Sequence, residues 1–420
     1  MYKSIFSTIL LNVLIIILFS GCVSINKLPI EEQTRNNTIE PSPSIVNLNP
    51  LFTRRCIQNS IASDTYPLLI DGTLVYSSSL WEIGLLDLND GAKRQLGKSF
   101  PLVAVSTDYR LLAYTTDDPS TMNIIDSKGM LIQTIAIPND WQGVVQWIDM
   151  ENLYLERFIS GSYNGPFNSE ASAILYNLKT GTYKEIIPNF PSFRFFDYRL
   201  TWNNYSYTRM VFDPQLSKVI YPQTINGEDY LGMMEIDNQV SIISVKSFPP
   251  IGSPQWSTDG SFFIASLYPG HIEDHVGFVS ERISTQNNSQ NKTSELFQID
   301  RNGEIHKLTS LTEQYNAFEV MPSLSPNDKY IAFWLFNDFS SIKSNPELAI
   351  LNIDSGEIIN LCLTDSSPTV SKPIWTDDNK IIVNVENGSK ILLIDWEKGF
   401  ANEIADEDRV AIAWMKTDLP

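Results

Sequence analysis

The chain has 420 residues, a formal net charge of −19 and a sequence pI near 4.6. A surface this acidic repels nucleic-acid phosphates and anionic lipid headgroups, so the composition argues against nucleic acid as a partner and against electrostatic adhesion to a membrane. Aromatic residues make up 11% and hydrophobic residues 43% of the chain, and no long stretch has helical periodicity, which favours an all-β body.

The first predicted element is a secretory leader over residues 1–21. Lys3 precedes the apolar run Ile9–Phe19, which ends in Phe19-Ser-Gly-Cys22, and this order is typical of a signal peptide. The ending resembles the lipobox of bacterial lipoproteins, in which Leu is usual where this chain has Phe19. The resemblance implies a lipid on Cys22 and a location in the cell envelope, outside the cytoplasm. The alternative is a retained transmembrane anchor, for which the run is short.

A flexible tether is predicted next, over residues 22–60. The segment is poor in aromatic residues and rich in Asn, Thr, Ser and Pro, notably in Asn36-Asn-Thr-Ile-Glu-Pro-Ser-Pro-Ser44. Such a composition cannot bury enough apolar surface to order itself. The folded body is therefore predicted to cover residues 61–420.

A turn-and-strand phrase recurs through that body. Its clearest copies begin at Pro254, Pro322 and Pro373, and each has a short apolar stretch, an Asp/Asn/Gly turn and a second apolar stretch. This is the pattern of a tight β-hairpin, and diverged copies raise the number to seven. A second strand pair follows most copies, as in Ala349–Leu361. Four strands per repeat is the composition of a propeller blade, so the sequence predicts a seven-bladed β-propeller of four-stranded antiparallel blades.

The hairpin phrase resembles the repeat of TolB-like and WD-repeat propellers. The closest matches are Trp256-Ser-Thr-Asp-Gly-Ser-Phe-Phe-Ile-Ala265 and Ser325-Pro-Asn-Asp-Lys-Tyr-Ile-Ala-Phe333, and the resemblance covers roughly residues 65–416. It implies that the repeated Trp packs between blades and that Asp and Gly form the turn. Members of these families act mostly as binding scaffolds, and some are accessory domains of peptidases.

Two further features concern closure of the ring. The C-terminal Val410-Ala-Ile-Ala-Trp-Met-Lys416 has the pattern of a first strand without partners, whereas the first repeat has a shortened opening strand, so the two are expected to pair. If Cys22 carries lipid, Cys56 and Cys362 remain as a pair in an oxidising compartment, and a disulfide between them is predicted. The alternative is two separate buried thiols.

Long insertions suggest where a ligand binds. With the strands of a blade named A to D from the centre outward, the expansions Phe158–Glu170, Phe190–Tyr207, Tyr268–Thr293 and Phe336–Pro346 are all B–C or D–A connections, which share one face. The segment Phe190–Tyr207 is rich in aromatic residues, the type that anchors interfaces together with Arg. The predicted ligand-binding residues are Arg194, Tyr198, Arg199 and Trp202. The alternative is that this aromatic run packs as the outer strand of the third blade.

Candidates for chemistry are few. His271-Ile-Glu-Asp-His275 lacks the spacing of a zinc helix and has a loop composition, Gly161-Ser-Tyr-Asn-Gly165 is no nucleophile elbow, and Asp87-Leu-Asn-Asp-Gly91 falls where other repeats have a turn. No catalytic residue, metal or cofactor is predicted. We expect a monomeric, membrane-anchored binding scaffold for a protein or cell-wall glycan. The alternative is an extracellular carbohydrate-active hydrolase or lyase, for which Glu273 and Asp274 are the only suggestive carboxylate pair.

Overall fold

The structure is a computed structural model, in which the chain divides into the units Met1–Ser42 and Pro43–Pro420. It describes residues 52–59, 71–78, 82–98, 103–116, 118, 120–138, 141–160, 169–192, 210–225, 228–246, 254–267, 295–311, 318–336, 345–365, 370–386, 389–406 and 409–417. Cys22 and the predicted leader lie outside these residues. In the described part of the chain, no helical segment has the length and hydropathy of a transmembrane span.

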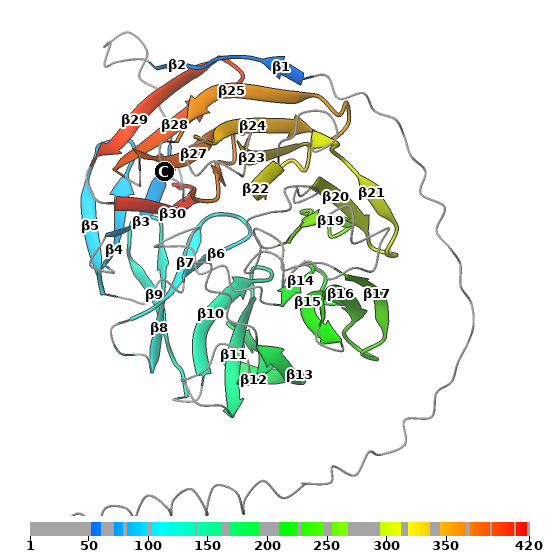
Figure 1. The fold of residues 1–420 in the computed structure, drawn as a ribbon. Coiled ribbons are helices and arrows are strands. Elements are labelled where there is room, and N and C mark those ends of the chain that lie inside the picture. The colour runs from blue at the N-terminus through cyan, green and yellow to red at the C-terminus, as the bar shows by residue number, and fades with distance from the viewer. Residues whose placement is uncertain are drawn as a thin grey trace, which may run out of the picture. The chain divides into compact units, whose positions relative to one another are not determined.

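Seven antiparallel sheets follow one another around a ring, which confirms the predicted propeller (Figure 1). Blade 1 holds β30 (Arg409–Met415), β3 (Thr73–Ser78), β4 (Glu82–Asp87) and β5 (Lys93–Lys98); blade 2 holds β6 (Val103–Val105), β7 (Leu111–Thr115), β8 (Thr121–Asp126) and β9 (Leu131–Ala136); blade 3 holds β10 (Trp141–Trp147), β11 (Asn152–Ser160), β12 (Ser169–Asn177) and β13 (Thr182–Ser192).

The remaining four sheets continue the same order of strands from the centre outward. Blade 4 holds β14 (Val211–Phe212), β15 (Lys218–Ile225), β16 (Glu228–Glu235) and β17 (Ser241–Lys246); blade 5 holds β18 (Gln255–Trp256), β19 (Phe262–Leu267), β20 (Glu295–Asp300) and β21 (Ile305–Lys307); blade 6 holds β22 (Phe318–Leu324), β23 (Tyr330–Phe336), β24 (Glu347–Asn352) and β25 (Ile358–Thr364); blade 7 holds β26 (Ile374–Trp375), β27 (Ile381–Val385), β28 (Lys390–Asp395) and β29 (Phe400–Asp406).

The A–B turns explain why the hairpin phrase recurs. In five blades the fourth turn residue has a left-handed backbone, and its N–H bonds to the carbonyl of the first turn residue; these residues are Tyr109, Leu216, Gly260, Asp328 and Asn379. Gly, Asn and Asp tolerate this conformation best, which accounts for the Asp/Asn/Gly signature. A Ser or Thr hydroxyl at the first position adds further bonds, as where the Ser257 hydroxyl donates to the Phe262 carbonyl at 2.9 Å.

The core lies between neighbouring blades. Trp256 and Trp375 are almost fully buried, and each indole N–H donates to a carbonyl of the preceding blade, of Val211 at 3.0 Å and of Ser323 at 2.8 Å. A buried indole that also finds its hydrogen-bond partner contributes both area and orientation. The Trp of the repeat therefore packs between blades, as its resemblance to TolB-like repeats implied.

Strand β30 closes the ring. It forms the inner strand of blade 1 and pairs antiparallel with β3 along its length, from Thr73 opposite Met415 to Ser78 opposite Arg409. The Trp414 indole covers Gly72 so closely that a Cβ at Gly72 would lie 2.1 Å from Nε1. The expected pairing of the C-terminal strand with the first blade is confirmed, and it removes the open ladder edges of both.

The N-terminal segment Phe52–Asn59, called the annex here, adds one strand to the outer edge of blade 6 and one to that of blade 7. Strand β1 (Phe52–Arg54) pairs in parallel with β25 of blade 6, and β2 (Gln58–Asn59) pairs in parallel with β29 of blade 7. Between them, Cys56 is joined to Cys362 of β25 in a disulfide with a Cα–Cα distance of 4.7 Å. The ordered body therefore begins at or before Phe52, earlier than the boundary at residue 60 that composition suggested. The reason is that strand pairing and a covalent bond hold this segment, which has little apolar surface of its own.

Candidate binding site in the central channel

Two faces of the ring differ in their connections. Each B strand runs away from the A–B turn, so A–B and C–D turns share one face, named here the turn face, and B–C and D–A connections share the other, the loop face. No turn on the turn face is longer than five residues, whereas every connection between β3 and β30 that exceeds five residues is on the loop face. The loop face therefore carries the long connections between strands.

The residues predicted from the sequence to bind a ligand, Arg194, Tyr198, Arg199 and Trp202, lie outside the described residues, between β13 and β14. Gly161–Gly165, between β11 and β12, and His271, Glu273, Asp274 and His275, between β19 and β20, also lie outside the described residues. Of the remaining candidates, the segment Asp87–Gly91 forms the C–D turn of blade 1, where Asp87 and Asp90 accept backbone N–H bonds from Asn89 and Ala92. Its carboxylates thus stabilise the turn. Among the described residues, no group of side chains could hold a metal ion.

Amide side chains join inner strands of adjacent blades. The Gln146 amide donates to the Phe212 carbonyl and accepts from the Phe212 N–H, both at 3.0 Å. Gln255 bridges blade 5 to blade 6 in the same way, accepting from the Leu324 N–H at 3.1 Å and donating to the Leu324 carbonyl at 3.4 Å. Because each amide replaces a missing ladder partner, neighbouring inner strands are held at a fixed separation around the axis.

Lys372 is the functional candidate that sequence reasoning missed. It belongs to the D–A connection between β25 and β26, two residues before β26 begins. Its amine donates to Gln255 Oε1 at 3.1 Å, reaching from blade 7 to blade 5 past the intervening blade 6. A contact between inner strands of blades that are not neighbours has to pass along the axis. Lys372 therefore occupies the central channel.

The backbone beside Lys372 is held from two sides. The Ser371 carbonyl accepts the Trp334 indole N–H at 2.8 Å, and the Ser371 hydroxyl accepts from Asn384 Nδ2 at 2.8 Å. Asn384 in turn binds both backbone groups of Ala411 in blade 1. These bonds tie blades 6, 7 and 1 together at the point from which the Lys372 side chain projects, so the amine starts from a fixed backbone.

Burial lowers the pKa of Lys372 from 10.5 to about 8. An ammonium loses solvation when protein surrounds it, and no charged group among the described residues offsets the loss. Gln255 is its one partner among the described residues, and a neutral amide oxygen compensates an ammonium only in part. Near neutral pH the channel therefore holds a cation that has no counter-charge among the described residues.

The hairpin phrase contains a faint signal for this residue. The positions before the phrase's proline are Lys372 in blade 7 and Met321 in blade 6, and Met321 is buried. A lysine at a place where the neighbouring repeat has a buried apolar residue marks a departure from the structural pattern. Composition does not reveal that its amine faces a second blade.

Lys372→Met is expected to raise the free energy of unfolding by about 1–2 kcal/mol at pH 7, because it removes an uncompensated charge and leaves Gln255 bonded to Leu324. The lowered pKa means that the folded state binds fewer protons than the unfolded state between about pH 8 and 10.5. Wild-type stability therefore rises relative to the variant as the pH increases through 8. Urea denaturation at pH 7 and 9.5 measures both values, and an advantage of the variant that is equal at the two pH values would contradict the assignment.

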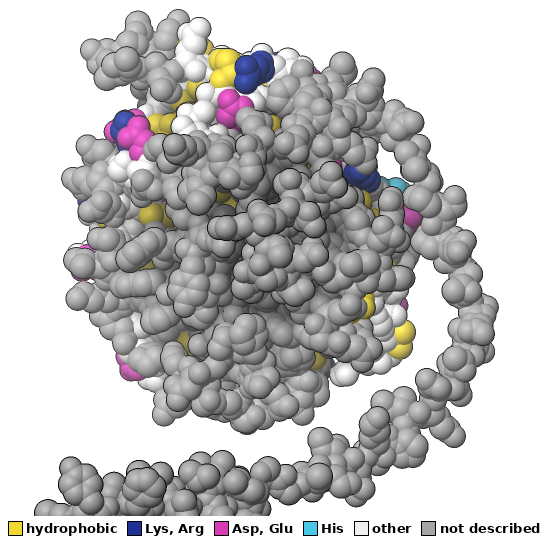
Figure 2. Space-filling view, in the orientation of Figure 1, with side chains coloured by type: hydrophobic (Ala, Val, Ile, Leu, Met, Phe, Trp, Pro, Cys, Tyr) yellow, Lys and Arg dark blue, Asp and Glu magenta, His cyan; other side chains and the backbone are white. Residues whose placement is uncertain are grey.

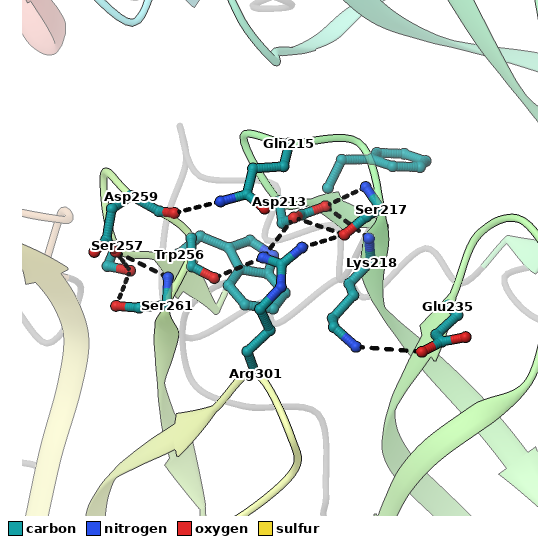
Figure 3. A network of polar contacts seen from close by, with 12 residues as sticks. Asp213, Gln215, Ser217, Lys218, Glu235, Trp256, Ser257, Asp259, Ser261 and Arg301 are labelled. Carbon is teal, nitrogen blue, oxygen red and sulfur yellow. Dashed lines mark hydrogen bonds and ion pairs between the residues drawn. The ribbon is translucent and has the colours of Figure 1, made fainter.

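A polar network on the turn face fixes blade 4 against blade 5 (Figure 3). Asp213 in the A–B turn of blade 4 has a fully buried side chain, and its Oδ2 lies 2.8 Å from Nη1 of Arg301 in the C–D turn of blade 5. Arg301 also donates to the Gly260 carbonyl at 2.8 Å and to the Ser217 hydroxyl. Gln215 adds a bond to the Asp259 carbonyl at 2.9 Å. Because each polar group is used by a neighbouring turn, this network is a structural clamp.

Comparison with known proteins agrees with the architecture. No protein-family model and no curated protein sequence matches the chain. Solved structures that resemble it include a mutant puromycin hydrolase (11% identity, 81% of this chain and 54% of that one, TM-score 0.50) and the acylaminoacyl peptidase of Pyrococcus horikoshii (13% identity, 80% and 53%, TM-score 0.50). TolB from Acinetobacter baumannii is 14% identical over 88% of this chain and 97% of that one, with a TM-score of 0.44.

The shared feature is the fold alone. Identities of 11–14% carry no information on ligand or activity, and this chain spans about half the length of the two hydrolases. The seven-bladed architecture that the count of hairpin repeats predicted is the one that the sheets form.

Proposed function

We propose that this chain is an extracytoplasmic lipoprotein whose propeller acts as a non-catalytic binding scaffold for a protein or a cell-wall glycan, held to the membrane by a lipid on Cys22. The observation that supports this function is the asymmetry of the ring. Every connection longer than five residues between β3 and β30 is on the loop face, while the turn face is built from short, hydrogen-bonded turns. A rigid ring with its long connections on one side is the usual arrangement of a recognition surface.

The segment between β13 and β14 supplies the proposed anchors of that surface. Arg194, Tyr198, Arg199 and Trp202 fall within it, and its flanking strands end on the loop face. Aromatic side chains bury a large area at a small cost in conformational entropy, and Arg adds directional hydrogen bonds. These four residues are proposed to contact the ligand.

A covalent bond supports the proposed location outside the cytoplasm. The Cys56–Cys362 disulfide supports a location outside the reducing cytoplasm, in agreement with a leader that ends at Cys22. The acidic net charge of −19 supports a partner other than nucleic acid. In the view of Figure 2, acidic and basic side chains of the described residues are interspersed along the rim of the ring.

Crosslinking in intact cells followed by co-purification tests the proposal. Tyr198→Ala with Trp202→Ala is expected to reduce the yield of crosslinked partner at least tenfold, because interface anchors of this type commonly contribute 2 kcal/mol or more. The matched control is Tyr183→Ala, an exposed tyrosine at the turn-face end of the same blade. An unchanged partner set in the double variant would contradict the assignment of the surface. Turnover of polysaccharides or chromogenic glycosides by the purified protein would contradict a non-catalytic role.

A further inference from the structure

The central channel contains one feature that the proposed scaffold does not explain. The Lys372 amine lies among the inner strands of the ring, and Gln255 Oε1 at 3.1 Å is its one partner among the described residues. An ammonium has three N–H donors, so two of them are unassigned. In a chain with 19 more negative than positive charges, a cation inside the ring without a carboxylate beside it needs a physical reason.

The carboxylates buried in nearby blades have other partners. Glu295 of blade 5 accepts from the Thr309 hydroxyl at 2.7 Å and from the Leu311 N–H at 2.8 Å. Asp365, in the same connection as Lys372, accepts from the Glu386 N–H at 2.8 Å. Each of these carboxylates is thus used within the framework of the blades, and none of them pairs with the Lys372 amine.

The geometry of Gln255 makes the position of the amine specific. Leu324 of blade 6 donates its N–H to Gln255 Oε1 and accepts from Gln255 Nε2, which settles the orientation of the amide. The oxygen therefore faces Lys372 and holds one of its N–H groups. With Ser371 anchored by Trp334 and Asn384, both ends of the Lys372 side chain are fixed, and the remaining N–H groups point away from Gln255.

We propose that Lys372 binds a carboxylate group of a ligand that enters the central channel. This inference rests on the proposed binding function and names the chemical group that its ligand presents. A singly charged oxyanion matches the single positive charge, whereas a dianion such as sulfate would leave one negative charge uncompensated in a strongly acidic protein. The two oxygens of a carboxylate can accept the two unassigned N–H groups. No covalent step is involved.

Amine reactivity provides the test. The purified full-length protein is treated with formaldehyde and cyanoborohydride at pH 7.5 and constant ionic strength, with and without acetate as the probe, and methylation of each lysine is followed by mass spectrometry. A bound carboxylate stabilises the ammonium and leaves less neutral amine to react. Acetate is therefore expected to slow methylation of Lys372 about fivefold and to leave the exposed residues Lys93 and Lys184 unchanged in the same sample.

Two variants sharpen this result. Gln255→Glu places a carboxylate on the atom that Lys372 already contacts, so Lys372 should methylate slowly without acetate and respond no further to it. Lys372→Met should abolish any acetate-dependent rise in Tm at constant ionic strength. Equal methylation of wild-type Lys372 with and without acetate would overturn the proposal, and stronger protection by sulfate than by acetate would overturn its choice of a carboxylate.

The failure of this inference differs from failure of the proposed function. If acetate does not protect Lys372 but wild-type protein still captures a partner in crosslinked cells, the channel site is wrong and the scaffold stands. If acetate protects Lys372 but no partner is captured, the channel site stands and the scaffold is wrong.

Discussion

Replacing Cys56 with Ser, or Cys362 with Ser, is expected to lower the free energy of unfolding by about 2–4 kcal/mol. The two cysteines are 306 residues apart in sequence, and the loop that their disulfide closes contains blade 1 without β30, blades 2 to 5 and most of blade 6. A cross-link of this span restricts the unfolded chain strongly, whereas the folded ring already brings both ends together. The stabilisation therefore comes mainly from the unfolded state.

Urea denaturation of oxidised wild type, reduced wild type and each single variant measures this effect. Reduced wild type and the two single variants should have the same free energy of unfolding, because each lacks the Cys56–Cys362 bond. Hydrogen exchange adds a local readout. The amides of Arg55, Ile57 and Gln58 bond to carbonyls of blades 6 and 7 at 2.9–3.0 Å, and they should exchange faster once the annex is no longer tethered. Coinciding denaturation curves for oxidised and reduced wild type would contradict the prediction.

Arg301→Met is expected to cost about 2–3 kcal/mol. The substitution keeps much of the apolar stem but removes the cation that lies 2.8 Å from the fully buried Asp213 carboxylate, so a negative charge stays buried without its partner. Backbone N–H groups of Ser217 and Lys218 still donate to Asp213 Oδ1, and Arg301 is 24% exposed, which together keep the cost below that of a fully buried pair. Loss of this clamp should also loosen blade 4 against blade 5.

A double-mutant cycle separates the ion pair from simple loss of packing. Asp213→Asn with Arg301→Met removes both charges, so the double variant should be more stable than Arg301→Met alone. The matched control is Lys398→Met in the C–D turn of blade 7. The Lys398 amine lies 2.9 Å from Asp395, but its side chain is 70% exposed, so its removal is expected to change the free energy of unfolding much less than Arg301→Met does. If Arg301→Met were as mild as Lys398→Met, the clamp would contribute little.

The two faces of the ring differ in the length and the hydrogen bonding of their connections. On the turn face, short turns bond to their neighbours, as Gln215 does to Asp259 and as Thr258 does to Asp328 in blade 6. Such contacts make adjacent blades rigid relative to one another. On the loop face the connections are longer, and the channel contains Lys372, which has no carboxylate partner among the described residues. Hydrogen-bonded turns on one face and long connections on the other are a pattern expected of a binding scaffold, in which stability and recognition use different residues.

Local signals in the sequence were sufficient for the repeating unit. The phrase around Trp256-Ser-Thr-Asp-Gly260 encodes a strand, a turn that needs a left-handed residue at its fourth position, and an indole that packs against the previous blade. All three are short-range properties, set by residues within a few positions of one another. The partnerless pattern of Val410–Lys416 likewise predicted the closing strand, because an unpaired ladder edge has to be completed by another strand.

Only the tertiary structure decided which distant residues meet. Lys372 and Gln255 are 117 positions apart and Arg301 lies 88 positions from Asp213, and each pair meets because seven sheets bend the chain into a closed ring. The annex at Phe52–Asn59 follows the same rule, since its composition predicts a loose tether but the outer edges of blades 6 and 7 supply its strand partners. Hydrophobic periodicity and turn conformation are determined by residues that are close in sequence. Whether a charge finds a partner depends on which strands the ring brings together.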